Sequence, residues 1–143
     1  MLNLLTIYAG LFLWSFLAAT LLPLGSEVAL VAVVRTEEQW LAPVLVATVG
    51  NYLGACTTYW IGRRAAQALG EGQQDDEKNQ TQAVRLLRRY GQPTLLLSWV
   101  PLIGDALVAL AGGMRLPFIQ FSFWTVLGKA ARYLAVAWAV CAL

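Results

Sequence analysis

Apolar residues occur in four long stretches along the chain, separated by short polar ones. Two of these stretches, residues 40–62 and 117–142, each fit one helix, because about 20 apolar residues are enough to cross a bilayer. Gly50 and Gly54, four residues apart in the first of them, would allow another helix to pack closely. The pattern predicts an all-α polytopic membrane protein.

The first stretch, residues 4–34, is too long for a single crossing. At about 1.5 Å per residue it would reach about 45 Å as one helix. Pro23 and Gly25 also interrupt it near the middle. We therefore expect a helix over about 4–21, followed by a broken or re-entrant segment over about 22–34.

A similar set of breaks falls within residues 92–114. Pro93, Pro101 and Gly104 lie in this otherwise apolar stretch, together with Gly112 and Gly113. A second broken or re-entrant hairpin is expected here, just before the last span.

The polar middle of the chain, residues 63–91, separates the two halves. Its last part predicts a short amphipathic helix at the membrane surface, with Val84 and Leu87 on the apolar face. It also holds six of the ten Lys and Arg residues, so the positive-inside rule places it in the cytoplasm. Three arginines flank the apolar face and are expected to contact anionic lipid head groups and to set the topology: Arg85, Arg88 and Arg89.

The two halves align without a gap at an offset of 78 residues. Matching broken segments in two such halves are typical of an inverted repeat. The expected single membrane domain, residues 1–143, would hold repeat 1 over about 4–62 and repeat 2 over about 92–142. The matched positions are Thr20 with Ser98, Pro23 with Pro101, Leu24 with Leu102, Glu27 with Asp105, Gly50 with Gly128 and Trp60 with Trp138.

Charged residues make up only 13% of the chain, about half the share usual in soluble domains, and 59% of the residues are hydrophobic. Four ionisable residues nevertheless fall at membrane depth: Glu27, Asp105, Lys129 and Arg132. Each would cost about 2.5 to 3.5 kcal/mol if it stood alone at the centre of the bilayer. A central cluster that pairs the two acids with the two bases is therefore expected, supported by the polar residues Asn51 and Ser98.

Two interpretations of this cluster stay open. In the first, a carboxylate takes up and releases a proton, and the cations hold the acids or an anionic head group. In the second, the protein does not transport anything, and the charges only hold the hairpins together in a structural or assembly protein.

Catalytic, metal and cofactor chemistry finds no support in the residues. The chain has no histidine, and its two cysteines, Cys56 and Cys141, lack metal-ligand spacing. No nucleophile–base pair is visible, so neither an enzyme nor a nucleic-acid-binding protein is expected. The N-terminal segment carries no Lys or Arg near its start and reads as a retained membrane segment.

Three stretches of the sequence resemble the DedA family, also called the VTT or SNARE-associated Golgi domain family, and within it the short YqaA-type bacterial members. They are PLGSEVAL, GNYLGACTTYWIGRR and RRYGQPTLLLSWVPLIGDALVALAGGMRLPF. The resemblance implies two re-entrant hairpins, an inverted repeat and a place in the bacterial inner membrane. It also implies a small transporter of lipids or polyprenyl phosphates (a flippase or scramblase), with proton coupling and a part in membrane homeostasis.

The chain departs from the pattern of the wider family at three charged positions. Two arginines of the second hairpin are replaced by Ser98 and Gly104, and an aspartate is replaced by Ala55. Glu27 matches the family's hairpin glutamate. Asp105, Lys129 and Arg132 would then restore the balance of two acids and two bases. Membrane lipids are the expected partners, with a polyprenyl phosphate or a phospholipid as substrate, and a second copy of the chain could help to enclose a lipid path.

Overall fold

The computed structural model describes residues 2–20, 25–36, 39–70, 82–100 and 103–143, and every regular element within them is a helix. This confirms the all-α prediction. Pro23 and Pro101, expected to break the two hairpins, lie outside the described residues. The elements in chain order are α1 (Leu2–Thr20), α2 (Ser26–Thr36), α3 (Leu41–Leu69), α4 (Gln82–Tyr90), the 3₁₀ helix η2 (Gln92–Trp99), α5 (Ile103–Gly113) and α6 (Phe118–Ala142).

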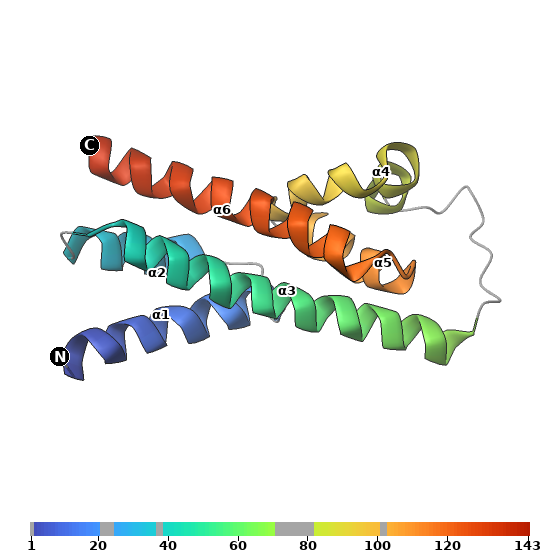
Figure 1. Ribbon diagram of the computed structural model, residues 1–143, viewed down its shortest axis with the longest axis horizontal. Helices are drawn as coiled ribbons and strands as arrows, with labels where there is room; N and C mark the ends of the chain where they lie inside the picture. The colour runs from blue at the N-terminus through green and yellow to red at the C-terminus, as the bar shows by residue number, and fades with distance from the viewer. Residues whose placement is uncertain (1, 21–24, 37–38, 71–81, 101–102) are drawn as a thin grey trace.

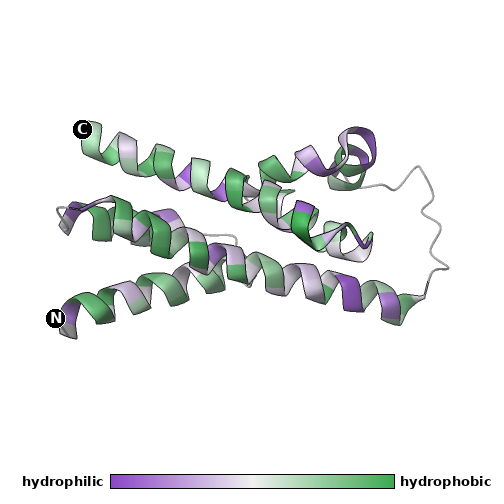
Figure 2. Cartoon of the chain, in the orientation of Figure 1, coloured by the Kyte–Doolittle hydropathy of each residue, from purple (hydrophilic) through white to green (hydrophobic). Residues whose placement is uncertain are grey.

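Three helices in the described part of the chain are long and apolar enough to cross a membrane: α1, α3 and α6. α3 and α6 pack against each other and run in opposite directions, and the two chain termini lie at the same end of the molecule (Figure 1). Hydrophilic residues gather on α4 and near the far end of α3, while the helices between are mostly hydrophobic (Figure 2). This arrangement is that of a polytopic membrane protein.

Two short helical hairpins complete the fold. α2 folds back beside α1 and packs against α6, whereas η2 and α5 form the corresponding hairpin towards the other end, where α5 packs against α3 (Figure 1). α2 and α5 have 11 residues each, so each is only about 16 Å long. Residues 92–114, predicted to be broken, thus form two short helices instead of one span.

α3 is longer than the sequence indicated. A polar stretch was expected from residue 63 onward, yet the helix continues to Leu69. The continuation RRAAQAL consists of strong helix formers, and the helix ends at Gly70, whose φ of 73° suits glycine. α4 occupies residues 82–90, close to the predicted amphipathic helix, and buries Ala83 and Leu87.

The hydrophobic core consists of two separate clusters of buried side chains. One surrounds Tyr59 and Phe121, and the other surrounds Leu30 and Tyr133. On α3 and on α6, the residues between these clusters include buried polar ones. The polar residues of the middle of the molecule are therefore held between two apolar layers.

Close helix packing at Gly54 carries a prediction for stability. A Cβ atom at Gly54 would lie 2.7 Å from the Cβ atom of Ala19, and it would also press on the backbone of Phe16. We expect Gly54→Ala to lower the free energy of unfolding by about 2 kcal/mol, because α1 must move away from α3. Thermal unfolding in detergent, followed by tryptophan fluorescence, measures the change.

Gly10→Ala is the matched control. A Cβ atom there meets nothing within 4 Å, so the substitution should stabilise α1 by about 0.5 to 1 kcal/mol. Equal shifts of the unfolding midpoint in the two variants would contradict the close contact between α1 and α3.

Candidate functional site

The two membrane-depth acids each lie in the first turn of a short helix. Glu27 begins α2, directly after Gly25, whose φ of 89° turns the chain into the helix. Asp105 lies in the first turn of α5. The N-terminal end of a helix favours negative charge, so both hairpins direct a carboxylate towards the middle of the molecule.

Gly104 allows the second hairpin to close. A Cβ atom at this position would collide with the backbone of Ser98 at the end of η2. The Gly104 amide donates a hydrogen bond to the Val100 carbonyl at 2.8 Å. Gly104 therefore lies inside α5 and serves close packing, whereas Gly25 serves the turn of the first hairpin.

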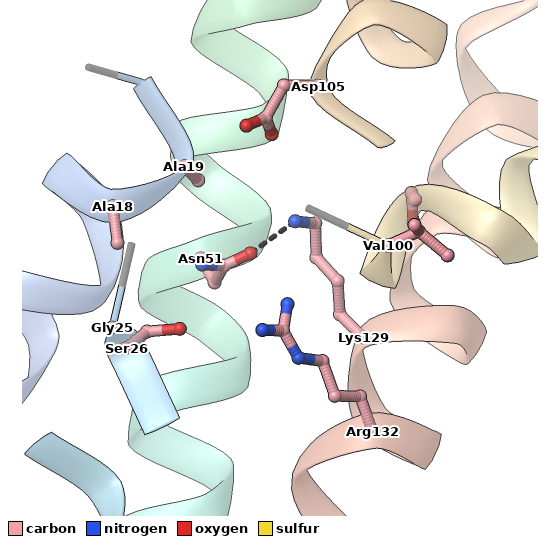
Figure 3. Close-up of a pocket in the computed structure, with 10 residues that line it drawn as sticks. Ala18, Ala19, Gly25, Ser26, Asn51, Val100, Asp105, Lys129 and Arg132 are labelled. Carbon is pink, nitrogen blue, oxygen red and sulfur yellow. Dashed lines mark hydrogen bonds between the residues drawn. The ribbon is translucent and has the colours of Figure 1, made fainter. Parts of the chain in front are cut away.

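The ends of the two hairpins meet at a small polar cavity of about 20 Å³ (Figure 3). That volume holds about one water molecule and no larger ligand. The cavity brings together all four membrane-depth charges or their immediate neighbours on α2, α3, α5, η2 and α6. Its lining consists of Ala18, Ala19, Gly25, Ser26, Asn51, Ser98, Val100, Asp105, Lys129 and Arg132.

Lys129 is the most deeply buried of the charges, with 3% of its surface exposed. Its Nζ atom donates a hydrogen bond to the Oδ1 atom of Asn51. The Nδ2 atom of Asn51 in turn donates to the Ser15 carbonyl at 3.0 Å. One hydrogen-bonded chain therefore joins α6, α3 and α1 at the cavity.

Glu27 and Arg132 form an ion pair that joins α2 to α6. The expected pairing of acids with bases is found for these two residues. Lys129, in contrast, donates to an amide oxygen, and within the described part of the chain Asp105 has no ion pair. Figure 3 shows the Asp105 carboxylate directed into the cavity, on the side where the Lys129 ammonium group also lies.

Ser98 adds a hydroxyl to the same wall. Its side chain is 4% exposed, and its oxygen has no hydrogen-bond partner among the described residues. Asp105 and Ser98 are thus polar groups of the second hairpin that face the cavity without a direct partner of this kind. Such groups are suited to receive a proton, a water molecule or a ligand atom.

The sequence gave no sign of two further hydrogen bonds next to the site. The Tyr133 hydroxyl donates to the Ser26 hydroxyl at 2.7 Å, and Trp14 donates to the Gly25 carbonyl at 3.2 Å. Tyrosine and tryptophan in apolar stretches read as packing or interface residues. Only the neighbouring position of Tyr133 and Arg132 hinted at a role in the site.

We expect Tyr133→Phe to destabilise the protein by about 1 kcal/mol, because the Ser26 hydroxyl, 3% exposed, would lose its partner inside the membrane. Tyr8→Phe on the half-buried face of α1 is the control and should change the unfolding midpoint little. Chemical unfolding in lipid bicelles compares the two variants, and equal midpoints would argue against the buried hydrogen bond.

The three arginines of α4 lie away from the cavity. Arg85, Arg88 and Arg89 are all exposed. Arg85 and Arg89 line a shallow surface groove with Gln82, Leu86 and Tyr90, and the Arg89 guanidinium lies 5.5 Å from the centre of the Tyr90 ring. The structure therefore separates a basic surface helix from the central charges.

The fold and the site define a multi-span helical membrane protein with charged residues at its centre. A model of the VTT domain matches residues 22–141. The inner membrane protein YqaA of Escherichia coli (strain K12) is 45% identical over 130 residues, which cover 90% of this chain and 87% of the relative. The chain belongs to the VTT-domain family, the DedA family, as its sequence motifs indicated.

Two further relatives support the same family. An uncharacterized protein of Haemophilus influenzae is 42% identical over 136 residues, covering 88% of this chain and 82% of the relative. An uncharacterized protein of Methanocaldococcus jannaschii is 23% identical over 127 residues, covering 88% and 79%. No solved structure shows a significant match to the chain.

Proposed function

We propose that the protein is a small, non-enzymatic transporter of phosphate-bearing lipids (a flippase or scramblase) in the bacterial inner membrane, coupled to protons and supporting membrane homeostasis. One observation carries the proposal: Asp105, an acid without an ion pair in the described part of the chain, shares a single small cavity with the buried Lys129. Ionisable residues at membrane depth mark substrate or proton paths.

The arrangement of the hairpins supports an inverted repeat around this cavity. Shifted by 78 residues, α2 falls on residues 104–114 and α3 begins at residue 119, each one residue from α5 and α6. Asn51 and Lys129 are 78 residues apart and bonded to each other, as expected of equivalent positions near a pseudo-two-fold axis. Sites of many transporters lie at such an interface between repeats.

The lengths of the short helices support re-entrant hairpins. At about 16 Å, α2 and α5 each reach about half of the 30 Å hydrocarbon core. Non-helical backbone at membrane depth is tolerated where it is buried in protein or lines a wet cavity. We propose that each hairpin enters from one side, turns at the central cavity and leaves again.

The basic residues favour one orientation. Arg63 and Arg64 lie near the polar end of α3, and the arginines of α4 follow the next part of the chain. The proposed topology places this region in the cytoplasm. Membrane lipids are the proposed partners, and a polyprenyl phosphate or a phospholipid is the proposed substrate, with a second copy of the chain as a means of enclosing the path.

A structural role is the second candidate. The ion pair between Glu27 and Arg132 supports it, because it fastens the first hairpin to α6. Buried pairs of this kind can fix a fold without any transport. The two candidates differ in whether the folded protein moves lipid.

The test is lipid flipping by the purified protein in proteoliposomes with an imposed pH gradient. One set of vesicles carries a fluorescent polyprenyl phosphate and the other a fluorescent phospholipid. We expect gradient-dependent movement of at least one probe. If neither probe moves in vesicles that contain correctly folded protein, the transport proposal fails and the structural role is favoured.

A further inference from the structure

An open groove of about 270 Å³ lies between η2 and α6, on the outer surface of the helices. Leu96, Trp99, Gly128, Ala131 and Arg132 line it. Trp99 is 45% exposed and forms one wall, and Ala131 is exposed as well. Apart from Arg132, all of these residues are apolar, and they would face the hydrocarbon region of the membrane.

Small residues on α6 leave this groove open. A Cβ atom at Gly128 would lie 2.6 Å from the Leu96 carbonyl oxygen, so η2 runs very close to α6 at this level. One turn further along, Ala131 leaves space beside Trp99 that a larger side chain would fill. The groove therefore follows from the packing of the two elements.

Arg132 belongs to both the groove and the polar cavity. Of the described residues that line either space, only Arg132 lines the two. Its side chain is 21% exposed and forms the ion pair with Glu27. Figure 3 shows the guanidinium group directed into the cavity. The arginine thus stands between the lipid-facing surface and the central charges.

We propose that this groove holds the hydrocarbon chain of a membrane lipid whose phosphate group binds Arg132 in place of Glu27. The inference rests on the proposed transport function and adds the lateral path by which a substrate reaches the site. A guanidinium group matches phosphate with two parallel hydrogen bonds. The apolar groove leaves the chain in surroundings like those of the bilayer.

The size of the cavity explains why the ion pair must open. About 20 Å³ holds one water molecule but no phosphate group. A head group can reach Lys129 and Asp105 only after Arg132 has exchanged its carboxylate partner for the phosphate and η2 has moved from α6. The exchange keeps the arginine charge paired throughout, which limits its cost inside the membrane.

The first arm of the test measures binding and does not depend on transport. The protein is reconstituted in vesicles with a phosphatidic acid that carries a photoreactive diazirine in one acyl chain, and in parallel with a diacylglycerol that carries the same chain. We expect phosphatidic acid to label Trp99 and Ala131 about tenfold more than diacylglycerol, since charge-assisted hydrogen bonds to phosphate contribute about 1.5 to 3 kcal/mol.

Arg132→Gln should remove this preference, while Arg132→Lys should keep part of it. Inorganic phosphate inside and outside the vesicles should not compete. Equal labelling by the two lipids, labelling spread evenly over α1, α3 and α6, or full competition by free phosphate would each overturn the lipid groove. Intact labelling in a protein that flips no lipid would leave the groove in place and reject only transport.

The second arm measures flipping. Ala131→Trp fills the groove and should reduce flipping about tenfold, whereas Ala135→Trp, one turn away on the same exposed side of α6, should leave it unchanged. If the wild type flips lipid and Ala131→Trp flips it equally well, the lateral path is wrong and the transport function stands. Ala131→Leu, a smaller change, repeats the comparison if the tryptophan variant fails to fold.

Discussion

Asp105→Asn should abolish gradient-driven flipping, with a fall of at least about 100-fold, in a protein that keeps its fold. Asparagine has nearly the shape of aspartate but binds no proton and carries no charge. Asp105 has no ion pair in the described part of the chain and lines the cavity with Lys129, so its replacement removes little stabilising energy. A loss of this size corresponds to about 2.7 kcal/mol at the rate-limiting step.

The measurement compares wild type and Asp105→Asn in proteoliposomes at matched protein content, with and without an imposed pH gradient. Asp75→Asn in the polar loop removes the same charge far along the sequence from the central stretches and serves as the control. If Asp105→Asn flips lipid with an undiminished response to the gradient, another group carries the proton and Asp105 is not the coupling residue.

Asp105 differs from Glu27 although the two residues occupy matching positions of the repeat. Under the offset of 78 residues, Arg132 corresponds to Gly54. The first hairpin therefore finds a guanidinium group on α6, whereas the second finds a glycine of α3 that packs against α1. One acid is neutralised and the other left facing the cavity because the two halves differ at this single position.

Much of the fold follows from the pattern of apolar residues. The stretches at 40–62 and 117–142 became α3 and α6, and the glycines and prolines of the other two stretches marked where the short helices of the hairpins lie. The extension of α3 to Leu69 escaped prediction because polarity was read as loop, although Arg, Ala and Gln propagate a helix well. Polarity reports the environment of a segment more directly than its backbone conformation.

The members of the site could be found from the sequence, but their partners could not. Charges at membrane depth stand out in any apolar chain, so Glu27, Asp105, Lys129 and Arg132 were evident. Which base meets which acid depends on the rotation of α6 against α2 and α3 by fractions of a turn. The bond from Lys129 to Asn51 and the bond from Tyr133 to Ser26 are results of that rotation.

Removing one member of the Glu27–Arg132 pair should be among the most destabilising changes in the protein. Arg132→Gln leaves Glu27 at membrane depth without its cation, and we expect a loss of about 3 kcal/mol in the free energy of unfolding. Glu27→Gln should cost a similar amount. The double variant Glu27→Gln with Arg132→Gln removes both charges and should recover most of the stability.

The double variant also separates structure from function. If the pair only fastens the first hairpin to α6, the stable double variant should behave like the wild type in every lipid assay. We expect it to be folded yet unable to flip lipid, because the phosphate group would find no guanidinium group at the groove. Unfolding midpoints in bicelles and flipping in proteoliposomes, measured on the same four proteins, give both answers. A folded double variant with full flipping would show that the ion pair is structural and that the lipid head group is bound elsewhere.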